Sequence, residues 1–510
     1  MESELRITIP GGMIEGMYAE DGDVRVFRGV PYAAPPVGEL RWRAPQPVQP
    51  WQGVRPTRYY ASACMHKRPS MKSFYGREFD SVEYPIGEDC LYLNIWAPRT
   101  ENAQNCPVAV WFHGGDSHAN KVIFNGENFA RKGVIIVTVG FRTGPFAGLC
   151  HPELSKEAEK DLGHYTSGNY GLLDQIVAVK WVKANIAAFG GDASRITVFG
   201  QSAGATVVER LISTPLLEGD LFAAIMQSAG GVDPRYIVNE ATLEQSEAYG
   251  EKILAEQGVH SIAEARQMSA EEVLNKFAGG PEQTMAYFSP KPDGYSLLYT
   301  PDRTSFENRI HQNVHYMIGT TKHEGMAYKL GETTCESLQK FLQNAYGSDW
   351  EQYWKNAGVR DDAVANMVRR QDSGDLKMAS AYAWVQLQNE QGRPAPYVYL
   401  FTKEAPGPES VGAFHSGEHA YVFKNMDKVS WRPYTEQDHK LANMMNQYWV
   451  NFMKTGDPNG AGLPKWDATD NIKKDPWIME LGLRVGMVRP EETKTSLFIK
   501  NFCLEYYKKH

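Results

Sequence analysis

The 510-residue chain lacks several features that mark whole classes of protein. No stretch approaches the roughly 18 consecutive apolar residues that a membrane-spanning helix needs. No Asn-x-Ser/Thr site for N-glycosylation occurs, and the N-terminal MESELRITIPGG has neither the basic nor the apolar region of a secretory signal peptide. These absences predict a protein that does not insert into membranes and lies in the cytoplasm. A secreted location is the alternative if a signal peptide has been trimmed.

Cysteine is scarce, and positive charge does not dominate. The six cysteines form no CxxC pair, so a zinc cluster is not expected, and buried free thiols are the usual state in a chain of this size. The net charge of −8 argues against a nucleic-acid partner, because such partners need a clustered basic face. We therefore expect a small-molecule partner, while the oligomeric state is not determined by the sequence.

Short apolar runs rich in β-branched residues alternate with helical patterns along the chain. A helix is expected over 169–189, because apolar side chains recur at helical spacing from Leu173 to Trp181, and Gly190 ends it. Strand, helix, strand in that order implies parallel crossovers, and hence an α/β fold with a mostly parallel central sheet and helices on both faces. The expected strands are 107–112, 134–141, 195–200, 315–321 and 396–401.

No internal repeat, low-complexity tract or linker divides the chain, so one domain spanning residues 1–510 is expected. Polar helical stretches near 240–280 and 333–390 interrupt the strand pattern. We interpret them as helical insertions over the active site, because open α/β sheets bind ligands at the carboxyl ends of their strands.

The sharpest chemical signal is RITVFGQSAGATVV at residues 195–208. A predicted strand runs into a G-x-S-x-G sequence centred on Ser202, and the following residues favour a helix. This is the context in which a nucleophile elbow holds a serine on a strained turn above the sheet. The alternative is a Gly/Ser turn without chemistry, which the strand-to-helix context disfavours.

A serine hydroxyl becomes a useful nucleophile only when a base takes its proton. In hydrolases with this elbow the chain order is serine, acid, histidine. Glu324 in IGTTKHEG and His415 in GAFHSGEHAYVF each follow a predicted strand, so both are expected to converge on Ser202. His323, next to Glu324, is a competing candidate for the base.

Several motifs, in order along the chain, resemble those of the type-B carboxylesterase/cholinesterase family of α/β-hydrolases. FRGVPYAAPPVGELRWRAPQP is similar to the family's N-terminal block and GEDCLYLNIWAP to its second signature. The further motifs are GNYGLLDQ, FGGD, FGQSAGA and YWVNFMKTGDPNG. The resemblance covers nearly the whole chain, and it implies an α/β-hydrolase fold and a serine esterase that requires no metal or cofactor.

The resemblance also implies roles for individual residues. Ser202 is implied as the nucleophile, His415 as the general base, and Glu324 as the acid that orients and stabilises the imidazolium. Ser228 resembles a buried serine that supports this acid, with an ordinary core hydroxyl as the alternative. His323 occupies a position that the family does not use as the base.

The resemblance implies several structural pairs as well. The implied ion pairs are Arg41 with Glu88 and Arg142 with Asp174. Cys64 and Cys90 resemble a family disulfide, and two free thiols are the alternative in a reducing compartment. We expect all of these pairs to stabilise the fold rather than to take part in catalysis.

The segment HGGDSH at 113–118 resembles the family's oxyanion loop. The N–H groups of Gly115, Asp116 and Ala203 are implied as donors to the oxyanion. Asp116 departs from the glycine-rich pattern, and its carboxylate would oppose an oxyanion about 4 Å away by about 4 kcal/mol. It must therefore turn away, be protonated, or pair with a cation.

Other residues near these motifs are candidates for the substrate pocket. His118 follows Asp116 by two positions, and with Lys121 it is the nearest candidate partner in sequence for that carboxylate. Gln201 stands next to the nucleophile where the family often has glutamate. His118 and Gln201 are therefore predicted to line the pocket.

The expected reaction is two-step acyl transfer, in which a serine carboxylesterase hydrolyses carboxylic esters through an acyl-enzyme on Ser202. Two alternatives stay open. The same triad would serve amide or carbamate hydrolysis or a redesigned activity, or the chain would be a non-catalytic binding homologue. Loss of a triad motif would mark the latter, and all three motifs are present.

Overall fold

The computed structural model describes residues 2–79, 84–99, 101, 104–115, 118–233, 241–279, 286–307, 314–326, 332–407, 409, 411–428, 431–470, 476–490 and 492–509. The chain forms two compact units. Unit 1 comprises Met1–Phe199, Arg210–Ala223 and Asn239–Pro301, and unit 2 comprises Gly200–Glu209, Ala224–Val238 and Asp302–His510. The single domain expected from the sequence stays a prediction.

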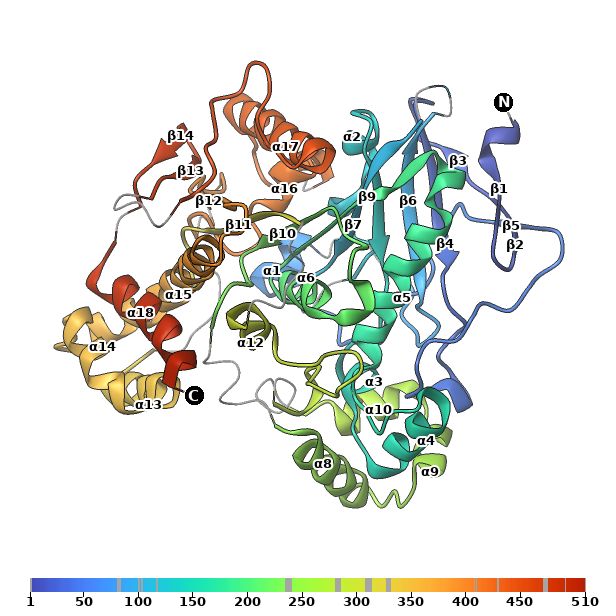
Figure 1. Ribbon diagram of the computed structural model, residues 1–510, viewed down its shortest axis with the longest axis horizontal. Coiled ribbons are helices and arrows are strands. Elements are labelled where there is room, and N and C mark those ends of the chain that lie inside the picture. The colour runs from blue at the N-terminus through green and yellow to red at the C-terminus, as the bar shows by residue number, and fades with distance from the viewer. Residues whose placement is uncertain are drawn as a thin grey trace. The chain divides into compact units, whose positions relative to one another are not determined.

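Unit 1 holds two sets of strands (Figure 1). A three-stranded sheet has the order β1 (Arg6–Ile9), β2 (Gly12–Glu15), β5 (Val54–Pro56). The larger set runs in the order β9 (Gly191–Gln201), β7 (Cys106–Phe112), β8 (Ile135–Val139), β6 (Tyr92–Pro98), β4 (Val24–Pro31), β3 (Met17–Tyr18). Strands β7 and β8 are parallel, whereas β8–β6, β6–β4 and β4–β3 are antiparallel pairs.

The central strands of unit 1 are buried along their whole length. Every residue of β7 and of β8 is buried, which is the pattern of strands covered on both faces. The strands predicted at 107–112, 134–141 and 195–200 are therefore confirmed.

The helix predicted over 169–189 is also confirmed, with one difference. It forms α5 (Tyr170–Asn185) followed by a 3₁₀ turn, η5 (Ile186–Phe189), and it ends at Gly190, whose φ of 89° lies in the left-handed region. The sequence spacing suggested one apolar face, but α5 is buried around most of its circumference. An interior helix needs apolar residues on all sides, and the spacing alone did not show this.

Three helices fill the first segment in which the sequence predicts an insertion. They are α8 (Leu243–Glu256), α9 (Ile262–Gln267) and α10 (Ala270–Phe277), and side chains of Thr242, Ser261 and Ser269 cap their N-termini. They share an apolar core with Trp42 and with the region of α3 (Gly144–Gly148) and α4 (Pro152–Leu162). These apolar contacts hold the three helices against the rest of unit 1.

Unit 2 carries strands in the order β14 (Val485–Val488), β13 (Ile478–Leu481), β12 (Tyr397–Phe401), β11 (His315–Thr321), β10 (Ala223–Gln227). Strand β12 pairs in parallel with both β11 and β13, and β14 closes the edge as an antiparallel partner of β13. The strands predicted at 315–321 and 396–401 are confirmed. Because β11 and β12 are parallel, the loops that follow them leave from the same edge.

The second predicted insertion is helical too. It contains α13 (Cys335–Tyr346), α14 (Trp350–Ala357) and the 29-residue α15 (Asp362–Glu390). The C-terminal helix α18 (Lys494–Lys509) packs along α15 and contacts α14 (Figure 1). Both segments are thus helical, whereas their being insertions into one domain, placed over the active site, stays a prediction.

Two further expectations concern membranes and cysteines. Within the described segments, no helix combines the length and the apolar character needed to cross a bilayer. The cytoplasmic location stays a prediction. Cys64 and Cys90 are both buried and are free thiols. The sequence left a disulfide and two free thiols as alternatives for this pair, and the structure contains two free thiols.

Candidate active site

Ser202 lies on the sharp turn between β9 and α6 (Ala203–Ser213). Its φ of 58° falls in the left-handed region, which non-glycine residues rarely adopt. The Ser202 N–H donates to the carbonyl of Gln227 at 2.8 Å, which ties the turn to the end of β10. This is the strand–turn–helix geometry that the G-x-S-x-G pattern predicts, and it sets Ser202 at a helix N-terminus that favours developing negative charge.

Glu324 and His415 come together from the loops that follow β11 and β12. His415 Nδ1 forms a short contact with Glu324 Oε2, and both side chains are buried. The other carboxylate oxygen, Oε1, accepts hydrogen bonds from the Thr320 hydroxyl and from the Thr321 N–H. The loop therefore holds one oxygen of Glu324 and directs the second one toward the imidazole.

Lys377, which extends from α15, joins this pair. Its Nζ lies 2.7 Å from Glu324 Oε2 and 3.1 Å from His415 Nδ1. Burial opposes ionisation of Glu324, yet Lys377 and then His415 hold the pKa of this carboxyl well below its usual value. Burial and then the charge of Lys377 lower the pKa of His415, whereas Glu324 acts to raise it.

Gln201 packs against the same imidazole. Its side-chain nitrogen lies 3.3 Å from His415 Nε2 and 3.4 Å from Nδ1, and its oxygen accepts a hydrogen bond of 3.0 Å from the Ser416 hydroxyl. Only 1% of Gln201 is exposed. Among the described residues, the Ser202 hydroxyl makes no hydrogen bond to His415, and such bonds are often long in unliganded enzymes.

Ser228 has a different partner from the one that the resemblance implies. Its hydroxyl donates to Glu418 Oε1 at 3.4 Å, and the Gln227 amide donates to the same oxygen at 3.5 Å. Burial, together with the nearby charge of Glu324, raises the pKa of Glu418 to about 8. Burial of Glu418 therefore favours its neutral form.

His323, the competing base, is held by the backbone of the neighbouring loop. The Nδ1 atom of its ring accepts a hydrogen bond of 2.9 Å from the Ala413 N–H. The backbone N–H of His323 donates to the Ala413 carbonyl at 3.0 Å. His323 therefore fixes the loop that leads to His415.

The residues of the predicted oxyanion hole are described in part. Ala203 is the first residue of α6, so its N–H lies at the helix N-terminus. Gly115 is an exposed residue in the turn after β7 of unit 1. Asp116 lies outside the described residues. The oxyanion roles of all three stay predictions.

His118 is buried within unit 1, in a stack of rings. Its ring centroid lies 3.6 Å from that of Tyr84 and 5.9 Å from that of His66. Lys121 is likewise buried, and its ammonium lies over the ring of Phe79 at 5.8 Å. Within unit 1, His118 thus packs among aromatic rings, and its predicted place in the substrate pocket stays a prediction.

The two ion pairs implied by the resemblance are confirmed. Arg41 binds Glu88 through two hydrogen bonds of 2.6 Å. Arg142 binds Asp174 through hydrogen bonds of 2.8 and 2.7 Å, and the Arg142 N–H adds a third to the same carboxylate. The second pair is almost fully buried, so it belongs to the core of unit 1.

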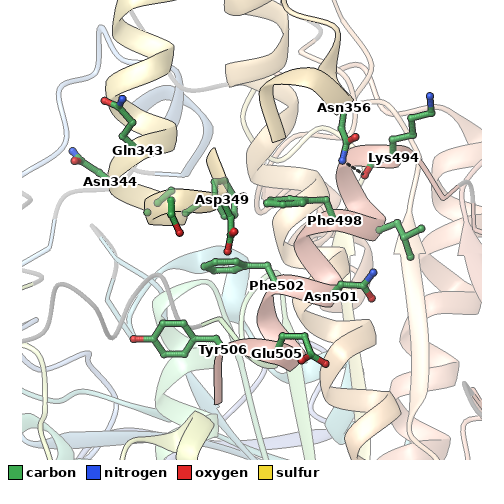
Figure 2. Close-up of a pocket in the computed structure, with 15 residues that line it drawn as sticks. Gln343, Asn344, Asp349, Asn356, Lys494, Phe498, Asn501, Phe502, Glu505 and Tyr506 are labelled. Atoms are coloured by element: carbon green, nitrogen blue, oxygen red, sulfur yellow. Dashed lines mark hydrogen bonds between the residues drawn. The ribbon is translucent and has the colours of Figure 1, made fainter. Parts of the chain in front are cut away.

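A cavity of about 800 Å³ in unit 2 does not involve the residues around Glu324. It is lined by α13, α14 and α18 and by the turn between α13 and α14 (Figure 2). Figure 2 shows the rings of Phe498 and Phe502 along α18, with Tyr506 beyond them. Neither Ser202 nor His415 lines it, so this cavity is not the reacting site.

Sequence reasoning did not single out two of these neighbours. Glu418 lies three residues after His415 in the same motif, and this proximity is the one signal that could have pointed to it. Lys377 lies within the segment predicted as a helical insertion. No local pattern shows that this helix passes the carboxyl end of β11.

Comparison with known proteins finds esterases that are similar to this chain over most of its length. The model of a family described as "Carboxylesterase family" matches residues 3–497. Fumonisin B1 esterase of Sphingopyxis macrogoltabida is 32% identical over 93% of this chain and 86% of its own length. Para-nitrobenzyl esterase of Bacillus subtilis (strain 168) is 30% identical over 96% of this chain and 98% of its own.

Solved structures show the same relationship. A structure titled PNB esterase superimposes with a TM-score of 0.81 at 26% identity, and the match covers 98% of this chain and 99% of that one. This likeness confirms the predicted fold class, an α/β-hydrolase with a large mixed sheet and helices on both sides.

Proposed function

Because this chain belongs to the carboxylesterase family and is a carboxylic ester hydrolase, we propose that Ser202, His415 and Glu324 form its catalytic triad. The observation that carries the proposal is the buried contact between His415 Nδ1 and Glu324 in the unit that holds the Ser202 elbow. A histidine held by a carboxylate at one nitrogen presents its other nitrogen as a base.

In the acylation step, Ser202 Oγ attacks the ester carbonyl while His415 Nε2 accepts the hydroxyl proton. Glu324 accepts the Nδ1–H hydrogen bond, which fixes the tautomer and stabilises the imidazolium that forms. His415 then returns the proton to the alkoxide leaving group as the C–O bond breaks. The alcohol departs and the acyl group stays on Ser202.

In the deacylation step, water takes the place of the alcohol. His415 removes a proton from the water as the oxygen attacks the acyl carbon, and the proton passes to Ser202 Oγ as the ester bond to the serine breaks. The products are the carboxylic acid and the free enzyme, so no atom remains on the protein.

The tetrahedral intermediate of each step carries an oxyanion that needs N–H donors. We assign these to Ala203, Gly115 and Asp116. The position of Ala203 at the start of α6 supports its part in this assignment, because backbone N–H groups at a helix N-terminus are free to donate. Loss of one such donor typically costs about 3–4 kcal/mol of transition-state stabilisation.

The substrate class that we propose is small carboxylic esters, aryl and nitrobenzyl esters included. The names of the two relatives, a para-nitrobenzyl esterase and a fumonisin B1 esterase, support an ester substrate.

The decisive experiment is labelling with an active-site-directed fluorophosphonate, followed by peptide mass spectrometry. We expect one adduct, on Ser202, and loss of both label and esterase activity in Ser202→Ala. Ser194→Ala is a matched control, because Ser194 is an exposed serine on the preceding strand. Labelling at another residue, or full activity in Ser202→Ala, would refute the triad.

A further inference from the structure

Two basic groups meet at one carboxylate oxygen in unit 2. Glu324 Oε2 contacts His415 Nδ1 and lies 2.7 Å from the Lys377 ammonium. The side chains of Glu324 and His415 are at most 5% exposed and that of Lys377 is 16% exposed. Solvent and salt therefore screen these charges poorly.

Lys377 lies close enough to His415 for its charge to act on the imidazole. A neutral imidazole that donates its Nδ1–H to Glu324 has no acceptor left at that nitrogen, and an ammonium is purely a donor. The 3.1 Å approach of Lys377 Nζ to Nδ1 is thus a contact between two donors that share one acceptor. Such a contact favours the uncharged ring over the imidazolium.

Charge balance leads to the same conclusion. In a triad of carboxylate and histidine alone, the negative charge of the acid is compensated when the imidazolium forms. Here Lys377 compensates Glu324 while His415 is still neutral. Protonation of the free ring then leaves a net positive charge in a buried site, which is costly.

We propose that Lys377 is a positioning residue whose fixed positive charge keeps His415 an uncharged base into the mildly acidic range. The inference rests on the proposed triad, because it assigns to Lys377 a control over the base of that triad. It also assigns to α15 a function beyond packing, since this helix carries the ammonium to the carboxyl end of β11.

Other ionisable groups surround the site and need to be accounted for. They are Glu418 before α16 (His419–Val422), Tyr399 on β12, His323 beside Glu324, and Asp372 and Asp375 on α15 itself. Burial raises the pKa of Glu418 to about 8 and that of Tyr399 well above its usual value, so both are uncharged in mild acid. Asp372 and Asp375 accept hydrogen bonds from the hydroxyls of Tyr353 and Thr495, respectively.

The test is the pH profile of kcat/KM for p-nitrophenyl acetate in the wild type, Lys377→Gln and Lys377→Arg. Glutamine keeps a donor for Glu324 but removes the charge, so its acid limb should move to higher pH by about one unit or more. Arginine keeps the charge, so its limb should stay near that of the wild type. Lys340→Gln is the matched control, because Lys340 is 71% exposed on α13.

The outcomes separate this inference from the proposed function. If Ser202 is labelled and all variants are active but the limb of Lys377→Gln coincides with that of the wild type, Lys377 does not control the base. If the wild type is not labelled at Ser202, the triad itself is wrong.

A variant that fails to fold does not remove the test. In that case the titration of the His415 ring in the wild type is followed by NMR, with the signal assigned by its loss in His415→Gln. Because burial lowers the same pKa, we expect a midpoint below the ordinary histidine value of about 6.5 that rises when the titration is repeated in Lys377→Met, and a wild-type midpoint at or above 6.5 overturns the inference.

Discussion

The side-chain nitrogen of Gln201 lies beside the imidazole of His415, 3.3 Å from Nε2 and 3.4 Å from Nδ1. The nearly equal distances mean that the amide approaches both ring nitrogens and is not directed at one of them alone. The residue next to the nucleophile thus contacts the proposed base directly. Gln201 packs against the ring, and its own side-chain oxygen is held by a hydrogen bond from the Ser416 hydroxyl.

This contact predicts the effect of a charge at position 201. Gln201→Glu keeps the shape of the side chain and adds a carboxylate beside His415, which favours the imidazolium. The acid limb of the kcat/KM profile should therefore rise by about one pH unit. Gln352→Glu, at an exposed position of α14, should leave the profile unchanged. A limb that moves to lower pH in Gln201→Glu would contradict the contact.

A second prediction concerns Asp116 in the proposed oxyanion loop. A carboxylate near the oxyanion opposes the transition state whatever the acyl group, so Asp116→Gly should raise turnover across p-nitrophenyl esters of graded acyl length. The measurement is kcat for each ester in both proteins. A loss confined to certain esters would show instead that Asp116 contacts those substrates.

The buried pair of Arg142 and Asp174 predicts a large effect on stability. Asp174→Ala leaves a buried guanidinium without its carboxylate, which should lower the free energy of unfolding by about 3–5 kcal/mol. Asp23→Ala removes an exposed partner of Arg131, and we expect a loss of at most about 1 kcal/mol. Urea denaturation of both variants measures the difference, and equal shifts would contradict the assignment of the pair to the core.

Asp375 on α15 predicts a pH-dependent effect. Burial, with the nearby charge of Asp372, raises the pKa of Asp375 to about 6. An aspartate in the unfolded chain has a pKa of about 3.9, so the folded protein binds this proton more tightly than the unfolded chain does. The ionised Asp375 therefore lowers the stability of the fold as the pH rises from about 4 to about 6. Asp375→Asn should raise Tm at pH 7.5 and leave it nearly unchanged at pH 4.

The matched control for this variant is Asp427→Asn, because Asp427 is 66% exposed. Its Tm should follow that of the wild type at both pH values. A stabilisation of Asp375→Asn that is equal at pH 4 and pH 7.5 would show that the effect does not come from the titration.

The thiol state of Cys64 and Cys90 can be tested by counting the thiols that react in the denatured protein. If these residues remain thiols, the denatured protein, prepared without reductant after expression in a reducing cytoplasm, should react with six equivalents of Ellman's reagent. Four equivalents would show that the bridge implied by the family resemblance has formed. Cys64→Ala should lower the count by one if both residues are thiols.

Local patterns were sufficient to predict the helices and strands and to propose Ser202 as the nucleophile. The run of buried residues in β7 and β8, the glycine that ends the helix at Gly190, and the strand–turn–helix context of Ser202 each depend on neighbours within a few residues. Residue type and spacing along the chain are enough to predict such local features. The order of the motifs was also sufficient to select Glu324 and His415 from many acids and 13 histidines.

The sequence by itself determined the fold class, the family and the candidate triad, because these depend on short patterns and on their order. The tertiary structure decided which groups surround the triad. Lys377 reaches Glu324 across 53 positions of the chain, and Gln201 reaches His415 across 214. No local pattern encodes such contacts, since they arise when α15 and the loops after the parallel strands meet at one edge. The charged and polar groups around the proposed base His415 are therefore determined by tertiary packing.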